Sequence, residues 1–284
     1  GYIGLELGIA YRKLGAEVSV VEAQDRILPA YDAELTQPVH DALKLLGVKL
    51  YLKHSVLGFD GTLQVRDPEG ETLNLETDQV LVAVGRKPNT QGWNLEALNL
   101  DMNGSAIKID SRCQTSMRNV YAIGDLVRGQ MLAHKAMEEG VMAAELIAGH
   151  HAEFNYDLII SVIYTHPEVA WVGLSEERAK AEGFEVKTGQ FAFAVNGRAL
   201  AADDNAGFVK FVADAKSDRL LGMHVIGPSA GDIIHQGLIA LEFGASVEDL
   251  QLMCFAHPTL SEVVHEAALA VDGRAIHAIQ RKKK

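Results

Sequence analysis

The sequence predicts an α/β fold in its first half and an α+β fold in its second half, and three observations lead to this prediction. In residues 1–22 an apolar helical repeat stops at Gly15, and a short apolar strand follows. Residues 120–147 have the pattern of a strand, a loop and a helix. After His151 the pattern changes to strands separated by polar turns, with helices among them, which is typical of an antiparallel sheet backed by helices.

The composition indicates a folded chain and argues against some classes of partner. The 284 residues, 48% of them hydrophobic, suffice for two globular regions. A net charge of -12 argues against nucleic acid or an anionic membrane as the main partner, and the basic run at residues 281–284 is interpreted as a solvated end. No apolar stretch is long enough to span a membrane. Cys113 and Cys254 form no C-x-x-C or metal pattern, so we expect reduced, buried thiols in a cytoplasmic protein without a bound metal.

The first residues fit the second half of a βαβ nucleotide-binding unit. Apolar residues recur there at helical spacing: Ile3, Leu7, Ala10, Tyr11 and Leu14. Gly1 and Gly4 match the last two glycines of G-x-G-x-x-G, whose first glycine and strand would lie upstream. Glu22 ends the strand at residues 18–21 and could bind the ribose hydroxyls of an adenosine, which favours NAD over NADP. Arg26 could meet a phosphate, although local pairing within its loop is the favoured interpretation.

Further α/β elements follow. The expected elements are a helix at 33–46, a strand at 48–52, a hairpin of 62–66 with 71–75, and a buried strand at 79–84. That last strand leads into Gly85-Arg86-Lys87-Pro88-Asn89, which from the residues alone is a turn. Residues 93–100 and 106–109 connect to the next segment.

A ligand site is predicted where the strand at 120–123 ends at Gly124-Asp125 and a helix begins near Met131. Ligands of open α/β sheets bind beyond the carboxyl ends of strands, where a helix N-terminus offers free N–H groups. Asp125 would then accept hydrogen bonds from a sugar-like hydroxyl. The alternative is a strand-end turn in which Asp125 satisfies a backbone donor.

The second half begins at a candidate boundary, residues 154–158. Its expected strands are 161–165, 169–172, 185–194, 208–213 and 220–226. Its expected helices are 175–183, 232–243, 246–253 and 261–270, the first with Ser175 as N-cap.

The stretch FAHPTLSE, residues 255–262, carries the second candidate site. Glu262 could curl back to one ring nitrogen of His257 and leave the other nitrogen free. A carboxylate that fixes the tautomer in this way suits a histidine acting as general base on a thiol near neutral pH. The alternative is a helix-capping turn with an incidental histidine.

Together these segments resemble the pyridine-nucleotide disulfide oxidoreductases, the glutathione reductase family. The motifs that carry the resemblance are VVEAQDRILP, YAIGDLV, MLAHKA, YTHPEVAWVG and AHPTLSE. The resemblance implies a Rossmann-like NAD domain at residues 1–84, the C-terminal segment of an FAD domain at 85–153, and an interface or dimerisation domain at 154–284.

FAD and NAD are the cofactors that the resemblance implies. The implied cofactor-binding residues are Gly1, Gly4, Glu6, Glu22, Gly85, Arg86, Asp125, Met131, Leu132, Ala133 and His134. Asp125 would hold the ribityl chain of FAD, and main-chain N–H groups near Ala133 and His134 would face the pyrimidine edge of the flavin. Glu6 would lie near the flavin and nicotinamide rings, although an exposed helix position is its simpler interpretation.

The resemblance is strongest to members that oxidise dihydrolipoamide with NAD as a shared component of 2-oxoacid dehydrogenase complexes. It implies a homodimer in which His257, oriented by Glu262, acts on the flavin and disulfide of the other subunit, with a lipoyl domain as partner. The His257-Pro258 bond is expected to be cis.

One departure from the family limits this expectation. The first flavin segment and its C-x-x-x-x-C pair are absent, so the chain resembles the C-terminal part of a longer polypeptide, and we expect these 284 residues alone to be inactive. The open alternatives are another NAD(P)H-dependent flavoprotein disulfide reductase, a soluble transhydrogenase, and a non-catalytic NAD-binding or dimer-forming module.

Overall fold

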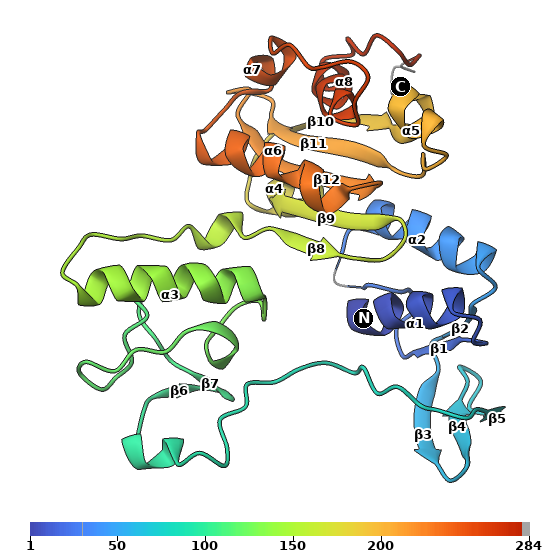
Figure 1. Cartoon of the computed structure of the whole chain (residues 1–284), viewed down its shortest axis with the longest axis vertical. Coiled ribbons are helices and arrows are strands. Elements are labelled where there is room, and N and C mark those ends of the chain that lie inside the picture. The colour runs from blue at the N-terminus through green and yellow to red at the C-terminus, as the bar shows by residue number, and fades with distance from the viewer. Residues whose placement is uncertain (30, 280–284) are drawn as a thin grey trace. The chain divides into compact units, whose positions relative to one another are not determined.

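The computed structural model describes residues 1–29 and 31–279, and these residues form two compact units (Figure 1). The first unit comprises Gly1–Ala83 and Ile160–Lys284, and the second comprises Val84–Ile159. The basic run at 281–284 lies outside the described residues. No helix within residues 1–29 and 31–279 is both long and apolar enough to cross a membrane.

The N-terminal part of the first unit is the predicted α/β segment. Its elements are α1 (Tyr2–Lys13), β1 (Ser19–Glu22), α2 (Ala33–Leu45), β2 (Lys49–Leu52), β3 (Ser55–Phe59), β4 (Thr62–Arg66) and β5 (Thr72–Glu76). Strands β1 and β2 pair in parallel, and β3, β4 and β5 form an antiparallel meander. The predicted β4–β5 hairpin is therefore confirmed, while β3 had no prediction.

The C-terminal part of the first unit is an antiparallel sheet in the order β10-β11-β12-β9-β8. Its strands are β8 (Ser161–Ile163), β9 (Glu168–Gly173), β10 (Val186–Ala192), β11 (Phe208–Asp214) and β12 (Leu220–Gly227). Its helices are α4 (Glu176–Ala181), α5 (Gly197–Ala201), α6 (Ala230–Glu242), α7 (Val247–Gln251) and α8 (Glu262–Val271). Helix α6 packs on β12 and β9, and α8 packs on β10 and β11 (Figure 1). The predicted antiparallel sheet backed by helices is confirmed, as is Ser175 as N-cap of α4.

A single apolar core joins these two parts of the first unit. Leu5 and Ile9 of α1 and Val39 of α2 cluster with Ile163 and Ile226 from the antiparallel sheet. Buried Lys210 of β11 adds ion pairs to Glu34 and Glu176, at 2.8 and 2.9 Å. The N-terminal α/β segment is thus fixed to the sheet by both apolar and charged contacts.

The second unit contains a long helix and several short elements. These are η1 (Leu95–Leu98), β6 (Met102–Asn103), β7 (Ala106–Ile107), η2 (Gly124–Leu126), α3 (Ala133–Ile147) and η3 (Tyr156–Leu158). Its core contains Ile107, Ile109, Cys113, Val127 and Met142. Helix α3 confirms the predicted helix after the Gly124-Asp125 turn.

Two strand predictions are wrong. The segment at residues 79–84 pairs with no strand in the described part of the chain, and Val82 and Val84 are 75% and 93% exposed. Residues 120–123 form only an isolated bridge, between Gln114 and Tyr121. A parallel strand is held by hydrogen bonds to a neighbouring strand, so an apolar run without such a neighbour stays irregular.

Two burial expectations also differ from the structure. Helix α1 packs through Leu5, Gly8 and Ile9, whereas Leu7 and Tyr11 are exposed. Because apolar residues occur on more than one side of this helix, its periodicity alone does not identify the packed face. Cys113 is buried as expected, but Cys254 is exposed because it lies in the loop between α7 and α8.

Candidate cofactor and catalytic sites

Gly1 and Glu22 lie next to each other in the first unit. Gly1 is the N-cap of α1, and its nitrogen lies 3.5 Å from Glu22 Oε2. The other carboxylate oxygen accepts a hydrogen bond of 3.0 Å from the Gln24 N–H. A Cβ on Gly4 would lie 3.4 Å from the Ala83 Cβ, which is ordinary van der Waals contact, so the start of α1 passes close to Ala83. An acidic side chain beside a helix N-terminus is the arrangement that a dinucleotide-binding unit needs.

Two neighbouring predictions, Glu6 and Arg26, have local partners. Glu6 Oε1 accepts a hydrogen bond of 2.7 Å from the Tyr164 N–H, which joins α1 to the segment after β8. Arg26 donates from Nη2 to the Pro29 carbonyl at 2.8 Å, which confirms the local pairing expected for this loop cation.

Arg86 and Asp125 meet in the second unit, although they are far apart in the sequence. Arg86 Nη2 lies 2.6 Å from Asp125 Oδ2, and the two side chains are 51% and 39% exposed. The pair connects the turn that begins at Gly85 to the Gly124-Asp125 turn, so the structure brings together two segments that were predicted separately.

The Gly124 turn and the start of α3 have the backbone features of a close ligand approach. Gly124 has a φ of +71°, and a Cβ there would lie 3.1 Å from the Ala136 Cβ, so a larger residue would be strained as well as crowded. Leu132 is the N-cap of α3 and provides no side-chain hydrogen bond to the first turn. A helix start without such a cap can offer main-chain N–H groups to an external acceptor. Met131 and Leu132 are half-buried, while Ala133 and His134 are exposed.

Sequence reasoning missed the buried polar pair beneath this turn. Lys135 and Glu139 are 1% and 0% exposed, and Lys135 Nζ lies 3.0 Å from Glu139 Oε1. The signal was available as a Lys and a Glu four residues apart on a helix. Such pairs are usually solvated, however, so the spacing alone does not predict burial.

His257 and Glu262 form the contact that the sequence predicted. His257 Nδ1 lies 2.9 Å from Glu262 Oε1, and Glu262 Oε2 accepts a hydrogen bond of 2.8 Å from the Thr259 N–H. Burial alone would raise the pKa of Glu262, but the Thr259 N–H and the nearby imidazole outweigh it and hold that pKa below its ordinary value. An ionised carboxylate only accepts hydrogen bonds, so Nδ1 is the donor to Glu262, and in the neutral imidazole the lone pair is then on Nε2.

The histidine side chain is exposed while its supports are fixed. His257 is 78% exposed and Glu262 is 24% exposed. Asn196, the N-cap of α5, donates a hydrogen bond of 3.1 Å to the Thr259 carbonyl, and Gln236 of α6 donates one of 2.8 Å to Ser261 Oγ. These two anchors were not predicted, because residues distant in sequence supply them. The His257-Pro258 bond is cis, as expected, and so is His166-Pro167.

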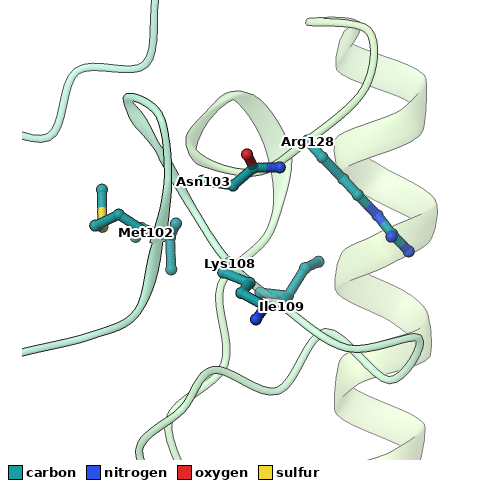
Figure 2. Close-up of a pocket in the computed structure, with 6 residues that line it drawn as sticks. Met102, Asn103, Lys108, Ile109 and Arg128 are labelled. Atoms are coloured by element: carbon teal, nitrogen blue, oxygen red, sulfur yellow. The ribbon is translucent and has the colours of Figure 1, made fainter.

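A separate cavity of about 380 Å³ lies in the second unit (Figure 2). Its lining residues are Met102, Asn103, Ile107, Lys108, Ile109 and Arg128. This set contains no residue that was predicted to bind a cofactor, so the cavity carries no part of the candidate site.

Comparison with known proteins identifies the class of protein. The family model described as pyridine nucleotide-disulphide oxidoreductase matches residues 1–140, and the model of the dimerisation domain of these enzymes matches residues 159–268. The chain belongs to the pyridine nucleotide-disulphide oxidoreductase family. FAD and NAD are the cofactors of this family's dihydrolipoyl dehydrogenases.

The most similar individual proteins include dihydrolipoyl dehydrogenases of bacteria and plants. The chain is 54% identical over 278 residues to a dihydrolipoyl dehydrogenase of Pseudomonas aeruginosa, covering 98% of this chain and 60% of that relative. It is 44% identical to the mitochondrial dihydrolipoyl dehydrogenase 2 of Arabidopsis thaliana, covering 98% of this chain and 56% of that relative. Among solved structures, LpdA from Mycobacterium tuberculosis matches with a TM-score of 0.82 at 27% identity, covering 94% of this chain and 59% of that one. The chain thus spans about 60% of the length of these relatives.

Proposed function

We propose that the complete protein containing this chain is a dihydrolipoyl dehydrogenase, which converts dihydrolipoamide and NAD⁺ to lipoamide, NADH and a proton. The observation that carries the proposal is the contact of 2.9 Å between His257 Nδ1 and Glu262 Oε1, in a chain of this family. The relatives named above supply the choice of substrate.

His257 is the proposed general base. Its Nε2 would take the proton from a substrate thiol, because Nδ1 is held by the ionised carboxylate of Glu262. As the imidazole gains a proton, the neighbouring carboxylate stabilises the positive charge that forms. Thr259 holds the Glu262 carboxylate, and Asn196 holds the backbone of the turn at Thr259. The orientation of the imidazole is therefore set before substrate binds.

Residues of both units are proposed to hold the cofactors. Gly1, Gly4 and Glu22 would bind the adenosine half of NAD, with the Glu22 carboxylate on the ribose hydroxyls. Asp125 would bind the ribityl hydroxyls of FAD, since its carboxylate lies beside a glycine turn that allows close approach. Bound FAD supplies the two-electron chemistry that links a dithiol to NAD.

The remaining proposed cofactor contacts are main-chain or adjacent groups. The start of α3, with Met131, Leu132, Ala133 and His134, would present N–H groups to the flavin. Glu6 in the first unit, and Gly85 and Arg86 in the second, are the other proposed cofactor contacts. The proposed domains are an NAD domain at residues 1–84, part of an FAD domain at 85–153, and an interface domain at 154–284.

The proposed assembly is a homodimer in which His257 serves the disulfide site of the other subunit. The match of residues 159–268 to a dimerisation domain supports it. The proposed partner is the lipoyl domain of a 2-oxoacid dehydrogenase complex, and the proposed location is the cytoplasm, in keeping with two unpaired cysteines.

Two half-reactions of the purified complete protein test this function. The flavin absorption should bleach when dihydrolipoamide is added, and NAD⁺ should then restore it with formation of NADH. Bleaching by NADPH or glutathione, but not by dihydrolipoamide, would instead indicate another disulfide reductase. A colourless, folded dimer that binds NAD would support the non-catalytic module.

A further inference from the structure

The buried pair Lys135–Glu139 holds the backbone of Gly124 from both sides. Glu139 Oε2 accepts a hydrogen bond of 2.7 Å from the Gly124 N–H, and Lys135 Nζ donates one of 3.3 Å to the Gly124 carbonyl. Each polar backbone atom of this glycine is therefore bound by one member of the ion pair. The next residue, Asp125, projects its carboxylate from the position that the pair fixes.

Tyr156 is a further contact of Glu139. Tyr156 donates a hydrogen bond of 3.0 Å to Glu139 Oε1, and its hydroxyl also lies 3.8 Å from Cys113 Sγ. Burial, followed by its contacts with Cys113 and Glu139, raises the pKa of Tyr156 well above its ordinary value, so the phenol keeps its proton and remains a donor. Glu139 thus has an acceptor role toward three donors: the Gly124 N–H, Lys135 and Tyr156.

This arrangement is more than is needed to pack a helix. A buried ion pair is weak evidence for stability, because the loss of hydration of both charges offsets much of their attraction. Apolar side chains would fill the same space, but they could not hold the N–H and the carbonyl of Gly124. The contribution specific to Lys135 and Glu139 is therefore the orientation of the Gly124-Asp125 turn.

We propose that Lys135 and Glu139 are positioning residues for FAD, which hold the Gly124-Asp125 turn so that Asp125 meets the ribityl chain. This inference rests on the proposed function only in taking Asp125 as a flavin ligand. Neither side chain needs to touch the cofactor, because the two act through the main chain of Gly124.

The sequence offers a matched control, because Glu138 precedes Glu139 on the same helix and is exposed. FAD binding to the apoprotein of the complete protein is measured by flavin fluorescence quenching for the Glu139→Gln and Glu138→Gln variants. Glu139→Gln should weaken FAD binding by about tenfold or more, since it removes the charge from the acceptor of three hydrogen bonds, and hydrogen bonds to charged groups are the stronger ones. Glu138→Gln should bind FAD as the wild type does. Equal FAD affinity in the two variants would overturn the inference.

Two further variants separate positioning from folding. Tyr156→Phe removes one donor to Glu139 without exposing a charge, and should weaken FAD binding by about two- to fivefold, in line with one modest hydrogen bond. Lys135→Met combined with Glu139→Leu removes both charges, and should recover most of the thermal stability that Glu139→Gln loses while FAD binding stays weak. If the double variant regains stability and FAD affinity together, the pair has only a structural role.

The same measurements distinguish this inference from the proposed function. A wild-type protein that binds FAD but does not oxidise dihydrolipoamide would contradict the proposed function, and the variants would still decide the positioning role. A wild-type protein with no affinity for FAD would overturn both.

Discussion

Replacement of Gly189 by alanine tests how helix α8, which begins at Glu262, is held against the sheet. Gly189 lies in β10 opposite Phe211, and it has no positive φ that would by itself disfavour alanine. A Cβ at this position would lie 2.2 Å from Val271 N and 2.5 Å from the Ala267 carbonyl oxygen. Both atoms belong to the backbone of α8, so no side chain can rotate away and the helix itself must move.

The expected cost follows from the size of this overlap. A Cβ in ordinary contact lies at least 3.4 Å from its neighbours, so α8 must move by about 1 Å, and forced overpacking of this kind costs about 1–3 kcal/mol. A cost of about 2 kcal/mol lowers the unfolding midpoint of a unit of this size by roughly 4–8 °C. Movement of α8 should also lengthen the His257–Glu262 contact and reduce dithiol oxidation.

Gly58→Ala is the matched control for this prediction. Gly58 also lies in a strand without a positive φ, but a Cβ there would meet nothing within 4 Å. Both replacements reduce the freedom of the unfolded chain equally, by about 0.4–1 kcal/mol, so the difference between them isolates the clash. The midpoints are measured by thermal unfolding followed by circular dichroism. Midpoints that agree within about 1 °C would refute the close packing of α8 on β10.

Two other predictions concern charge. Hydrogen bonds from Lys180 and, to a smaller extent, Lys210 lower the pKa of Glu176 from 4.5 to about 2. The ionised Glu176 therefore stabilises the folded state fully above pH 4.5, and this stabilisation is lost as the pH falls toward 2. That lowering would correspond to about 3 kcal/mol in full, but the Glu176 side chain is still 25% exposed and water screens its ion pairs, so we expect Glu176→Gln to lose about 1 kcal/mol at pH 7. Measured by urea unfolding, the difference in stability between the wild type and Glu176→Gln should shrink as the pH is lowered from 4.5 to 3. A difference that stays constant with pH would show that the ionisation of Glu176 does not contribute to stability. Glu22→Ala should reduce the preference for NADH over NADPH by about tenfold or more, because the Glu22 carboxylate of the wild type would repel a 2′-phosphate. The preference is measured as the ratio of the two kcat/KM values. An unchanged ratio would show that Glu22 does not belong to the nucleotide site.

The local parts of the fold could be predicted from the sequence. The β4–β5 hairpin, α3 and the turn before α8 are determined by residues close together in the chain, and the structure confirms them. The His257–Glu262 contact could be predicted for the same reason, because its members are only five positions apart in the sequence, across one stiff turn.

The predictions that failed concern features that depend on residues distant in the sequence. Residues 79–84 have the composition of a buried strand, but strand formation needs a partner that composition does not specify. The burial of Lys135 with Glu139 depends on Gly124 and Tyr156, neither of which the helix pattern identifies. The Arg86–Asp125 pair likewise joins two turns 39 residues apart.

The central claim is that His257, held by Glu262, is the base that deprotonates a dithiol. The direct test is the rate of flavin reduction in the complete protein carrying His257→Gln, measured by stopped flow with dihydrolipoamide and, separately, with NADH. Loss of a general base typically slows its step by about 10²–10⁴-fold, so reduction by dihydrolipoamide should fall by this amount while reduction by NADH stays near the wild-type rate. A variant that is reduced by dihydrolipoamide as fast as the wild type, or that loses both reactions equally, would contradict this role of His257.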